Sequence, residues 1–291
     1  MDYFLQLAGI VIAIHSERPL TVAPEYQSFL LDSPASSDVD VFLSWDWETV
    51  TLPAAPMLGE DALQQYFQDG TQWYCLTKAG PKGPIACAQY DADFRQIHCT
   101  INEKPFLMPT KAFASVMRML PLRALLLHFD VLFFHAAQIS LHGKGILFTA
   151  PSGTGKTTQA RLWEKYRSAE LVCNDRVLVR CLNGVWQTFG YPLDGSEPVC
   201  SNQVNRLSAI VLLQQGIQNR VSQPSPSQTL RFLMGQMVMD CWSGPARETH
   251  VLLLMSLIVQ IPILQLTCTP DQAAVEALEQ SLIERKVFPY G

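Results

Sequence analysis

The chain has little charge, and its basic residues form no cluster. Of its 291 residues 16% are charged, and 26 acidic residues against 21 basic ones give a net charge of −5. Nucleic-acid-binding domains concentrate lysine and arginine in a patch that neutralises phosphates, and this sequence has no such patch. The composition therefore argues against a nucleic-acid partner, although a few basic residues suffice to bind one nucleotide.

Long apolar runs and an N-terminal targeting signal are also missing. The longest apolar run, 251–259, is interrupted by a serine and is much shorter than the ~20 residues that span a bilayer. Residues 1–6 include no lysine or arginine, so the apolar stretch 7–14 indicates a strand rather than a signal peptide. We expect a cytoplasmic protein with no membrane partner.

The eight cysteines form neither a zinc-binding pattern nor a disulfide framework. They are scattered along the chain, without a C-x-x-C pair. In a chain of this length such cysteines are typical of a reduced cytosolic protein, where they lie mostly in the core. Hydrophobic residues make up 48% of the sequence, which is enough for a core in one large domain or two ordinary ones.

Residues 1–109 have the pattern of a β-rich domain. Short apolar segments are separated by Pro, Gly, Asp and Ser, and residues 61–67 fit one short helix. The expected strands are 7–14, 40–45, 73–76 and 94–99. Pro105 and Pro109 mark the boundary at which we expect this domain, a candidate for binding the acceptor, to end.

Residues 110–291 alternate helical and extended patterns, as α/β domains do. Apolar residues recur at helical spacing from 110 to 134, where Pro121 should kink or split the helix. Hairpins are expected at 135–150 and at 176–189, the second around Asn183-Gly184. Further strands are expected at 170–175, 209–213 and 263–268, and helices at 230–239, 251–260 and 271–286.

The most informative segment is the octapeptide Ala150-Pro151-Ser152-Gly153-Thr154-Gly155-Lys156-Thr157. It follows the apolar strand 145–149 and precedes the helical segment 158–166. A strand, a glycine-rich turn, Gly-Lys-Thr and a helix make the P-loop arrangement, with Ala150 in place of the usual first glycine. The alternative is a chance match in a polar turn, but the flanking strand and helix argue against it.

The chemistry of phosphate binding explains this spacing. Gly153 and Gly155 let the backbone curl until consecutive N–H groups face one anion, and the helix N-terminus adds positive potential. Lys156 can reach the β- and γ-phosphates, and the hydroxyl of Thr157 can ligate Mg²⁺. The segment therefore predicts a nucleotide site.

Two further residues are candidates for catalysis. Asp175 ends the strand after the octapeptide's helix, at the end of the strand where open α/β sheets bind ligands. The alternative for Asp175 is a turn residue before the next strand. His135 opens the strand that precedes the octapeptide's strand, where it either faces the site or lies in the core with its polar atoms satisfied.

These segments resemble those of a known family. The run His135-Ala136-Ala137, the segments 145–148 and 151–157, and Val172-Cys173-Asn174-Asp175-Arg176 resemble the HPr kinase/phosphorylase-like ATPases, which share a P-loop fold with the phosphoenolpyruvate carboxykinases. Residues 206–212 resemble, more weakly, the strand after that family's substrate loop. The resemblance spans about residues 130 to 215 and implies a phosphoenolpyruvate carboxykinase-like P-loop domain of the α/β class, with mixed sheets and flanking helices.

The resemblance implies a site for ATP and Mg²⁺. The phosphates would contact Ser152, Gly153, Thr154, Gly155, Lys156, Thr157 and Thr158. It places His135 near the γ-phosphate and implies that Asp175 contacts Mg²⁺ and acts as the catalytic base. The family usually has Asp-Asp where this chain has Asn174-Asp175, and an amide cannot act as a base, so Asp175 or another acid must do so. In the loop 190–198, Asp194 and Glu197 could complete the Mg²⁺ coordination; the alternative is a plain surface loop.

The implied activity is ATP-dependent phosphorylation of a hydroxyl, above all a serine of a peptide or protein. Related short kinases accompany the enzymes of ribosomal-peptide biosynthesis, so a peptide-tailoring kinase is the specific hypothesis. A small-molecule hydroxyl kinase would use the same residues, whereas a non-catalytic regulatory protein would bind ATP without transferring phosphate. The family often forms rings, so a homo-oligomer is expected by analogy.

Overall fold

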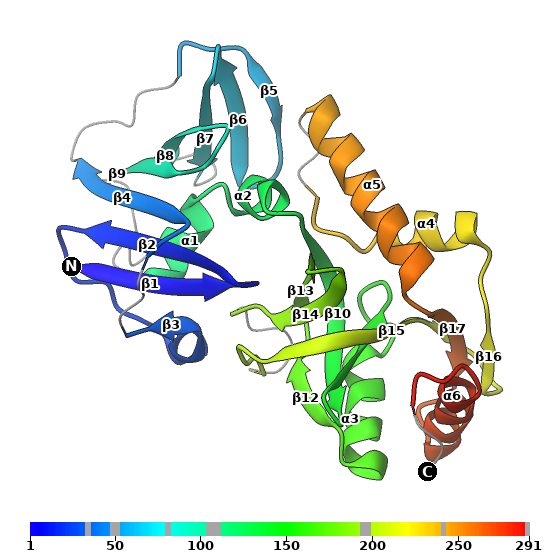
Figure 1. Cartoon of the computed structure of the whole chain (residues 1–291). Coiled ribbons are helices and arrows are strands. Elements are labelled where there is room, and N and C mark those ends of the chain that lie inside the picture. Colours follow the sequence, from blue (N-terminus) through cyan, green and yellow to red (C-terminus); the bar gives the residue numbers. More distant parts are fainter. Residues whose placement is uncertain are drawn as a thin grey trace. The chain divides into compact units, whose positions relative to one another are not determined.

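The computed structural model describes residues 1–32, 36–46, 53–78, 83–102, 112–192, 199–239 and 243–288. The fold is mixed α/β and contains two mixed sheets, which belong to two compact units (Figure 1). The first unit comprises Met1–Phe129 and Asp240–Glu248, and the second comprises Asp130–Met239 and Thr249–Gly291. The first unit thus continues past residue 109, where the sequence pattern placed a domain boundary.

The sheet of the first unit has the strand order β3-β1-β2-β4-β9-β8-β7-β6-β5. The pairs β2–β4 and β4–β9 are parallel and the others antiparallel. Its elements are β1 (Asp2–Leu7), β2 (Ile10–Ser16), a 3-10 helix (Pro24–Phe29), β3 (Leu30–Leu31), β4 (Val39–Asp46), β5 (Met57–Glu60), β6 (Gln64–Asp69), β7 (Gln72–Lys78), β8 (Pro84–Asp91), β9 (Gln96–Asn102), α1 (Phe113–Met119) and α2 (Leu122–His128).

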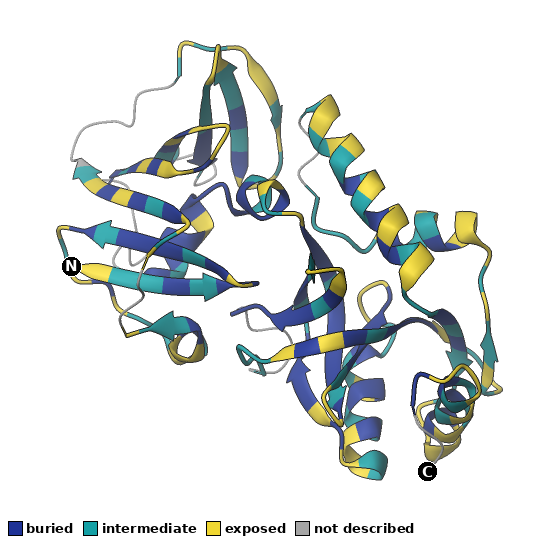
Figure 2. Cartoon of the chain, viewed as in Figure 1, coloured by how far each residue is buried: buried dark blue, intermediate teal, exposed yellow. Residues whose placement is uncertain are grey.

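The two helices after the sheet belong to the first unit because side chains of the sheet bind them. The amide of Gln64 donates to the carbonyl oxygens of Arg118 and Leu120 at 3.1 Å, and Arg123 forms an ion pair with Asp61. Burial alternates along β4 and β9, as expected for a sheet with one covered face (Figure 2).

Two sequence predictions in this unit are wrong. Residues 61–67 are not a helix: Asp61 caps a turn by accepting the N–H groups of Leu63 and Gln64, and the strand β6 follows. The stretch 7–14 is not one strand, because Ala8 and Gly9 adopt positive φ and turn the chain into the hairpin β1–β2. Both errors concern local turns that an apolar or helical pattern does not reveal.

The second unit carries a sheet in which β11, β15 and β17 run parallel to one another. β10 pairs antiparallel with β11, β12 and β13. The elements are β10 (Val131–Leu141), β11 (Lys144–Thr149), α3 (Lys156–Arg167), β12 (Glu170–Cys173), β13 (Arg176–Leu182), β14 (Val185–Gly190), β15 (Val204–Gln215), β16 (Arg220–Ser222), α4 (Pro226–Met234), β17 (Ile263–Cys268) and α6 (Gln272–Glu284). The helix α5 (Gly244–Gln260) begins in the first unit and belongs to the second from Thr249 onward.

Most expected elements of residues 110–291 are confirmed, with shifted ends. The helix over 110–134 is split at Pro121, as expected, but its last residues are wrong, because Asp130 adopts φ 58° and β10 begins at Val131. The helix expected at 230–239 begins at Pro226, where the Ser225 side chain caps it, and ends at Met234. The helix expected at 251–260 begins already at Gly244. The Asn183-Gly184 hairpin is confirmed, with both residues at positive φ.

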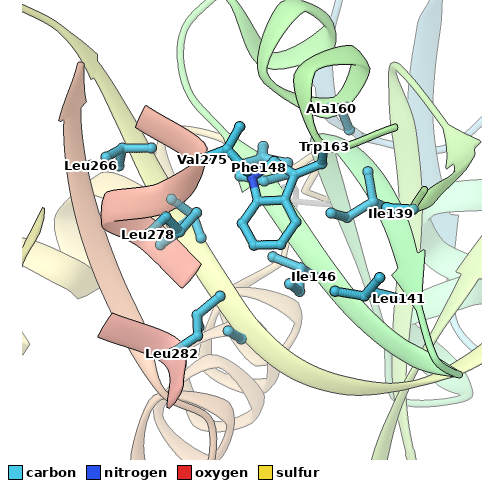
Figure 3. Close-up of a cluster of buried hydrophobic side chains, with 14 of the residues drawn as sticks. Ile139, Leu141, Ile146, Phe148, Ala160, Trp163, Leu266, Val275, Leu278 and Leu282 are labelled. Atoms are coloured by element: carbon cyan, nitrogen blue, oxygen red, sulfur yellow. The ribbon is translucent and has the colours of Figure 1, made fainter. Parts of the chain in front are cut away.

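The core of the second unit surrounds the fully buried Trp163 of α3. Figure 3 shows its indole ring between side chains of α6, among them Leu278, and side chains of β10 and β11, among them Ile139 and Ile146. This packing joins α3 to the sheet and to α6, and therefore fixes the start of α3 relative to the end of β11. Among the helices of the described ranges, none is long and apolar enough to cross a membrane.

Candidate functional site

A glycine-rich loop connects β11 to α3 in the second unit (Figure 1). We call residues 150–155 the glycine loop. Gly153 and Gly155 have φ values of +78° and +107°, in the left-handed region that favours glycine. Ala150 is buried, whereas Ser152 and Gly153 are exposed. The strand, turn and helix expected from the octapeptide are therefore present, with the helix beginning at Lys156.

The side chain of Lys156 folds back over the glycine loop. Its Nζ donates to the carbonyl oxygens of Ala150 at 2.9 Å and Pro151 at 3.4 Å, and the residue is only 7% exposed. Burial lowers the pKa of Lys156, while the nearby carboxylate of Asp175 acts in the opposite direction. The loop thus carries an ammonium group that is held in place and partly desolvated.

His135 and Asp175 form a pair at the junction of β10 with β12 and β13. The backbone N–H of Ala136 donates to the carbonyl oxygen of Asp175 at 3.1 Å, which sets the two strands side by side at this point. As a result the Nε2 atom of His135 lies 3.2 Å from Oδ1 of Asp175. The hydroxyl of Thr149 donates to the carbonyl oxygen of His135 at 2.9 Å, so the end of β11 is tied to the same place.

The electrostatic surroundings keep His135 neutral near pH 7. Burial lowers the pKa of His135, and the cations Lys156 and Arg176 lower it further, although Asp175 opposes them. His135 therefore presents a neutral imidazole to the Asp175 carboxylate, with its Nε2 atom 3.2 Å from Oδ1.

A cavity of about 350 Å³ brings these groups together, and we call it the Asp175 cavity. Its lining consists of His135, Ser152, Gly153, Gly155, Lys156, Thr157, Thr158, Asn174 and Asp175. The glycine loop and the start of α3 form one wall, and the residues that follow β12 form another. Residues predicted from three separate sequence segments thus line one cavity.

The guanidinium of Arg176 is a feature that the sequence analysis gave no role. Its Nη1 lies 3.6 Å from Oδ2 of Asp175. The carboxylate of Asp175 therefore has the guanidinium of Arg176 beside one oxygen and the imidazole of His135 beside the other. In the sequence, the only indication of a role for Arg176 is its position directly after Asp175. Adjacent side chains in an extended chain point in opposite directions, so this position does not predict that the two side chains meet.

The loop 190–198 was expected to supply a second acid to the Mg²⁺ site, but Asp194 and Glu197 lie outside the described residues. Within the described ranges no three His, Cys, Asp or Glu side chains are grouped so that they could hold a metal ion. Among the described residues that line the Asp175 cavity, the carboxylate of Asp175 and the hydroxyl of Thr157 could offer oxygen ligands to a cation, together with the oxygens of a bound phosphate. Mg²⁺ is commonly bound in this way, through one or two carboxylates and substrate phosphates.

Comparison with known proteins finds little similarity. No family model matches the chain, and no curated protein matches it. One solved structure, the Hpr(Ser) kinase/phosphatase from Coxiella burnetii, aligns with 53% of this chain and 98% of its own at 11% sequence identity and a TM-score of 0.31. A TM-score this low does not establish a common fold.

Proposed function

We propose that the second unit is an ATP-dependent kinase that transfers the γ-phosphoryl group to a hydroxyl. The proposal is carried by one observation: the paired side chains of His135 and Asp175 line the same cavity as Lys156 and the glycine loop. Phosphoryl transfer needs a phosphate cradle, a cation for the developing charge and a group that receives the proton of the acceptor. Each of these needs has a candidate in the Asp175 cavity.

In this proposal the glycine loop and the first turn of α3 bind the phosphates as a P-loop does. The backbone N–H groups of residues 152–158 would face the phosphate oxygens, and the N-terminus of α3 adds a favourable potential. The ammonium of Lys156 would neutralise the charge that spreads over the γ-phosphoryl oxygens. The carbonyl oxygens that now hold Lys156 lie in the same loop, so the lysine needs only a change of side-chain conformation to reach a phosphate.

Asp175 would act as the catalytic base. Its carboxylate accepts the proton of the acceptor hydroxyl as the hydroxyl oxygen forms a bond to the γ-phosphorus, and the bond between that phosphorus and the bridging oxygen breaks to release ADP. His135 holds the carboxylate in position through Nε2. Asn174 cannot replace Asp175 as the base, because an amide does not accept the proton of an alcohol.

The residues fit one Mg²⁺ ion bound together with the nucleotide. Thr157 and Asp175 would hold it, and the bound ion supplies neutralisation of phosphate charge. Glu197 stays a predicted third ligand outside the described residues. Asp175 is proposed both as a ligand of the ion and as the acceptor of the proton, so one carboxylate oxygen would bind Mg²⁺ while the other accepts the proton.

The proposed acceptor is a serine of a peptide or protein, as the sequence resemblance over residues 130–215 implies, and a precursor peptide is its most specific form. The N-terminal domain is the proposed place for binding that acceptor. A second candidate, a regulator that binds ATP without transfer, is favoured by one feature: the family's first acid is here the buried amide Asn174.

A screen of acceptors tests the proposal. The protein is incubated with γ-labelled ATP and Mg²⁺, and with serine-containing peptides in one arm and small polyols in the other. We expect label to appear on a peptide. Label on a polyol would identify a small-molecule kinase, and ATP binding without any labelled acceptor would leave the regulator as the remaining explanation.

A further inference from the structure

On the side of the glycine loop that Asp175 does not line, one of two neighbouring cavities is also lined by the first turn of α3. It measures about 410 Å³, and we call it the Gln159 cavity. The glycine loop, the first turn of α3 and the ends of β15 and β17 enclose it. All of these residues belong to the second unit.

The sheet topology places this cavity next to the glycine loop, at the carboxyl edge of β15 and β17, where part of a ligand held by the loop could lie. Strands β11, β15 and β17 are parallel, and Thr149, Leu212 and Gln265 stand side by side in their register. The carboxyl ends of parallel strands meet at one edge of the sheet, where α/β folds bind ligands. A ligand with its phosphates at the loop can leave the loop toward Asp175 or toward β15 and β17.

The chemistry of the two sides differs. The Asp175 cavity offers an acid, an imidazole and the Lys156 ammonium, which suit a reacting phosphoryl group. The described lining of the Gln159 cavity includes no acidic and no basic side chain, but it does include the amides of Gln159, Gln214 and Gln215. It suits an uncharged ligand part with both donors and acceptors.

Gln159 points to such a ligand most directly. The residue is 2% exposed, and its Nε2 has no hydrogen-bond acceptor within the part of the chain that the structure describes. Its Oε1 lies 4.0 Å from the thiol of Cys268 on the opposite wall. A buried donor without an acceptor is costly, so a ligand acceptor at this position would satisfy it.

The neighbouring amides complete the pattern. Gln215 donates to the carbonyl oxygens of Gly153 and Thr154 at 3.4 Å, which ties the cavity to the glycine loop and leaves its own oxygen as an acceptor. An amide pairs well with the adenine edge, which presents one amino donor beside a ring acceptor. Guanine presents adjacent donors instead, and those are better matched by a carboxylate, which this lining lacks.

We propose that the Gln159 cavity binds the adenosine part of ATP, with its triphosphate lying along the glycine loop toward Asp175. This inference rests on the proposed function, because it assumes that the loop binds the phosphates. It adds the position of the base and a preference for adenine over guanine.

Alkylation of Cys268 tests the proposed position of the adenosine without any substitution in the protein. The thiol lines the cavity and is partly exposed, whereas Cys87 of the first unit serves as the internal control. We expect saturating ADP to slow alkylation of Cys268 at least about fivefold and to leave Cys87 unchanged, as measured by mass spectrometry of the digested protein. Tripolyphosphate, which has no nucleoside, should protect Cys268 much less. Tight ADP binding without protection of Cys268 would overturn the inference.

A variant tests the contact. Gln159→Leu keeps the size of the side chain and removes its amide, and Gln272→Leu on the exposed start of α6 is the control. We expect Gln159→Leu to weaken ADP binding about five- to tenfold and tripolyphosphate binding less than about twofold, as measured by calorimetry. Wild-type protein should bind GDP about tenfold more weakly than ADP.

The outcomes separate this inference from the proposed function. If tripolyphosphate binds and Lys156→Ala abolishes that binding, the loop is a phosphate site. ADP that then binds no more tightly than tripolyphosphate would overturn the adenosine site alone. If neither ligand binds, the proposed function fails and the adenosine site fails with it.

Discussion

The Nε2 atom of His135 lies 3.2 Å from Oδ1 of Asp175, although His135 belongs to β10 and Asp175 lies between β12 and β13. The backbone hydrogen bond from Ala136 to Asp175 creates this proximity. Burial, Lys156 and Arg176 lower the pKa of His135, so the imidazole beside this carboxylate is neutral near pH 7. The pair gives the Asp175 cavity a carboxylate with an imidazole beside it.

If His135 acts through Asp175, their substitutions should not be additive. We expect Asp175→Asn to lower kcat by a factor of about 100 to 10,000, the usual contribution of general base catalysis. His135→Ala should lower kcat about tenfold, because the carboxylate remains but loses its orientation. The double variant should be no slower than Asp175→Asn. Steady-state kinetics with ATP and a labelled peptide measures this, and multiplied effects in the double variant would contradict a positioning role for His135.

Lys156→Ala should abolish stabilisation of the protein by ATP. A ligand at 100 times its Kd stabilises the folded state by about 2.7 kcal/mol, which raises the melting temperature. We expect this shift to vanish in Lys156→Ala and to persist in Lys165→Ala, which removes an exposed lysine from the same helix. Thermal melts with and without ATP provide the measurement. An unchanged shift in Lys156→Ala would remove the lysine from its assigned role.

Stability should fall as the pH falls below 6.5, because of His250. Burial lowers the pKa of this histidine from 6.5 to about 4, and the residue is 3% exposed. Below pH 6.5 the unfolded chain therefore binds a proton on His250 that the folded chain does not bind. The free energy of unfolding is highest above pH 6.5 and declines toward pH 4. Between pH 6.5 and pH 5 the loss from this group is about 2 kcal/mol. Urea unfolding at both pH values should show a loss smaller by that amount in His250→Leu, and equal losses in the two proteins would refute this assignment.

Trp163→Ala should destabilise the second unit strongly. The side chain is fully buried between α3, α6 and the sheet (Figure 3), and the truncation of a buried tryptophan costs about 3–5 kcal/mol. As a control, Phe42→Ala removes a partly exposed ring from the first unit. Urea unfolding followed by circular dichroism compares the two, and a loss below about 1 kcal/mol in Trp163→Ala would show that the core is packed differently.

The sequence predicts the features of the fold and of the site that depend on neighbours along the chain. The octapeptide, the hairpin at Asn183-Gly184 and the break at Pro121 are local features with their own conformational rules, and all three lie where the pattern placed them. The turn at Ala8-Gly9 and the strand β6 were missed, because a continuous apolar run conceals a tight turn and tertiary pairing overrides a weak helical pattern.

Long-range features could not be read from the sequence. The parallel pairing of β11 with β15 joins residues about sixty positions apart, and it is this pairing that places Gln214 and Gln215 beside the glycine loop. No periodicity encodes such distances, so the Gln159 cavity could be located only in the structure.

The most direct test of the central claim is the transfer of label from γ-labelled ATP to a serine-containing peptide by wild-type protein and by Asp175→Ala, under conditions in which both bind ATP. Glu170→Gln, an exposed acid at the start of β12, is the matched control. We predict labelled peptide with wild-type protein and with Glu170→Gln, and a loss of at least about 100-fold with Asp175→Ala. Equal labelling by wild-type protein and Asp175→Ala would contradict the assignment of Asp175 as the base, and the absence of labelling from all three proteins would contradict the kinase itself.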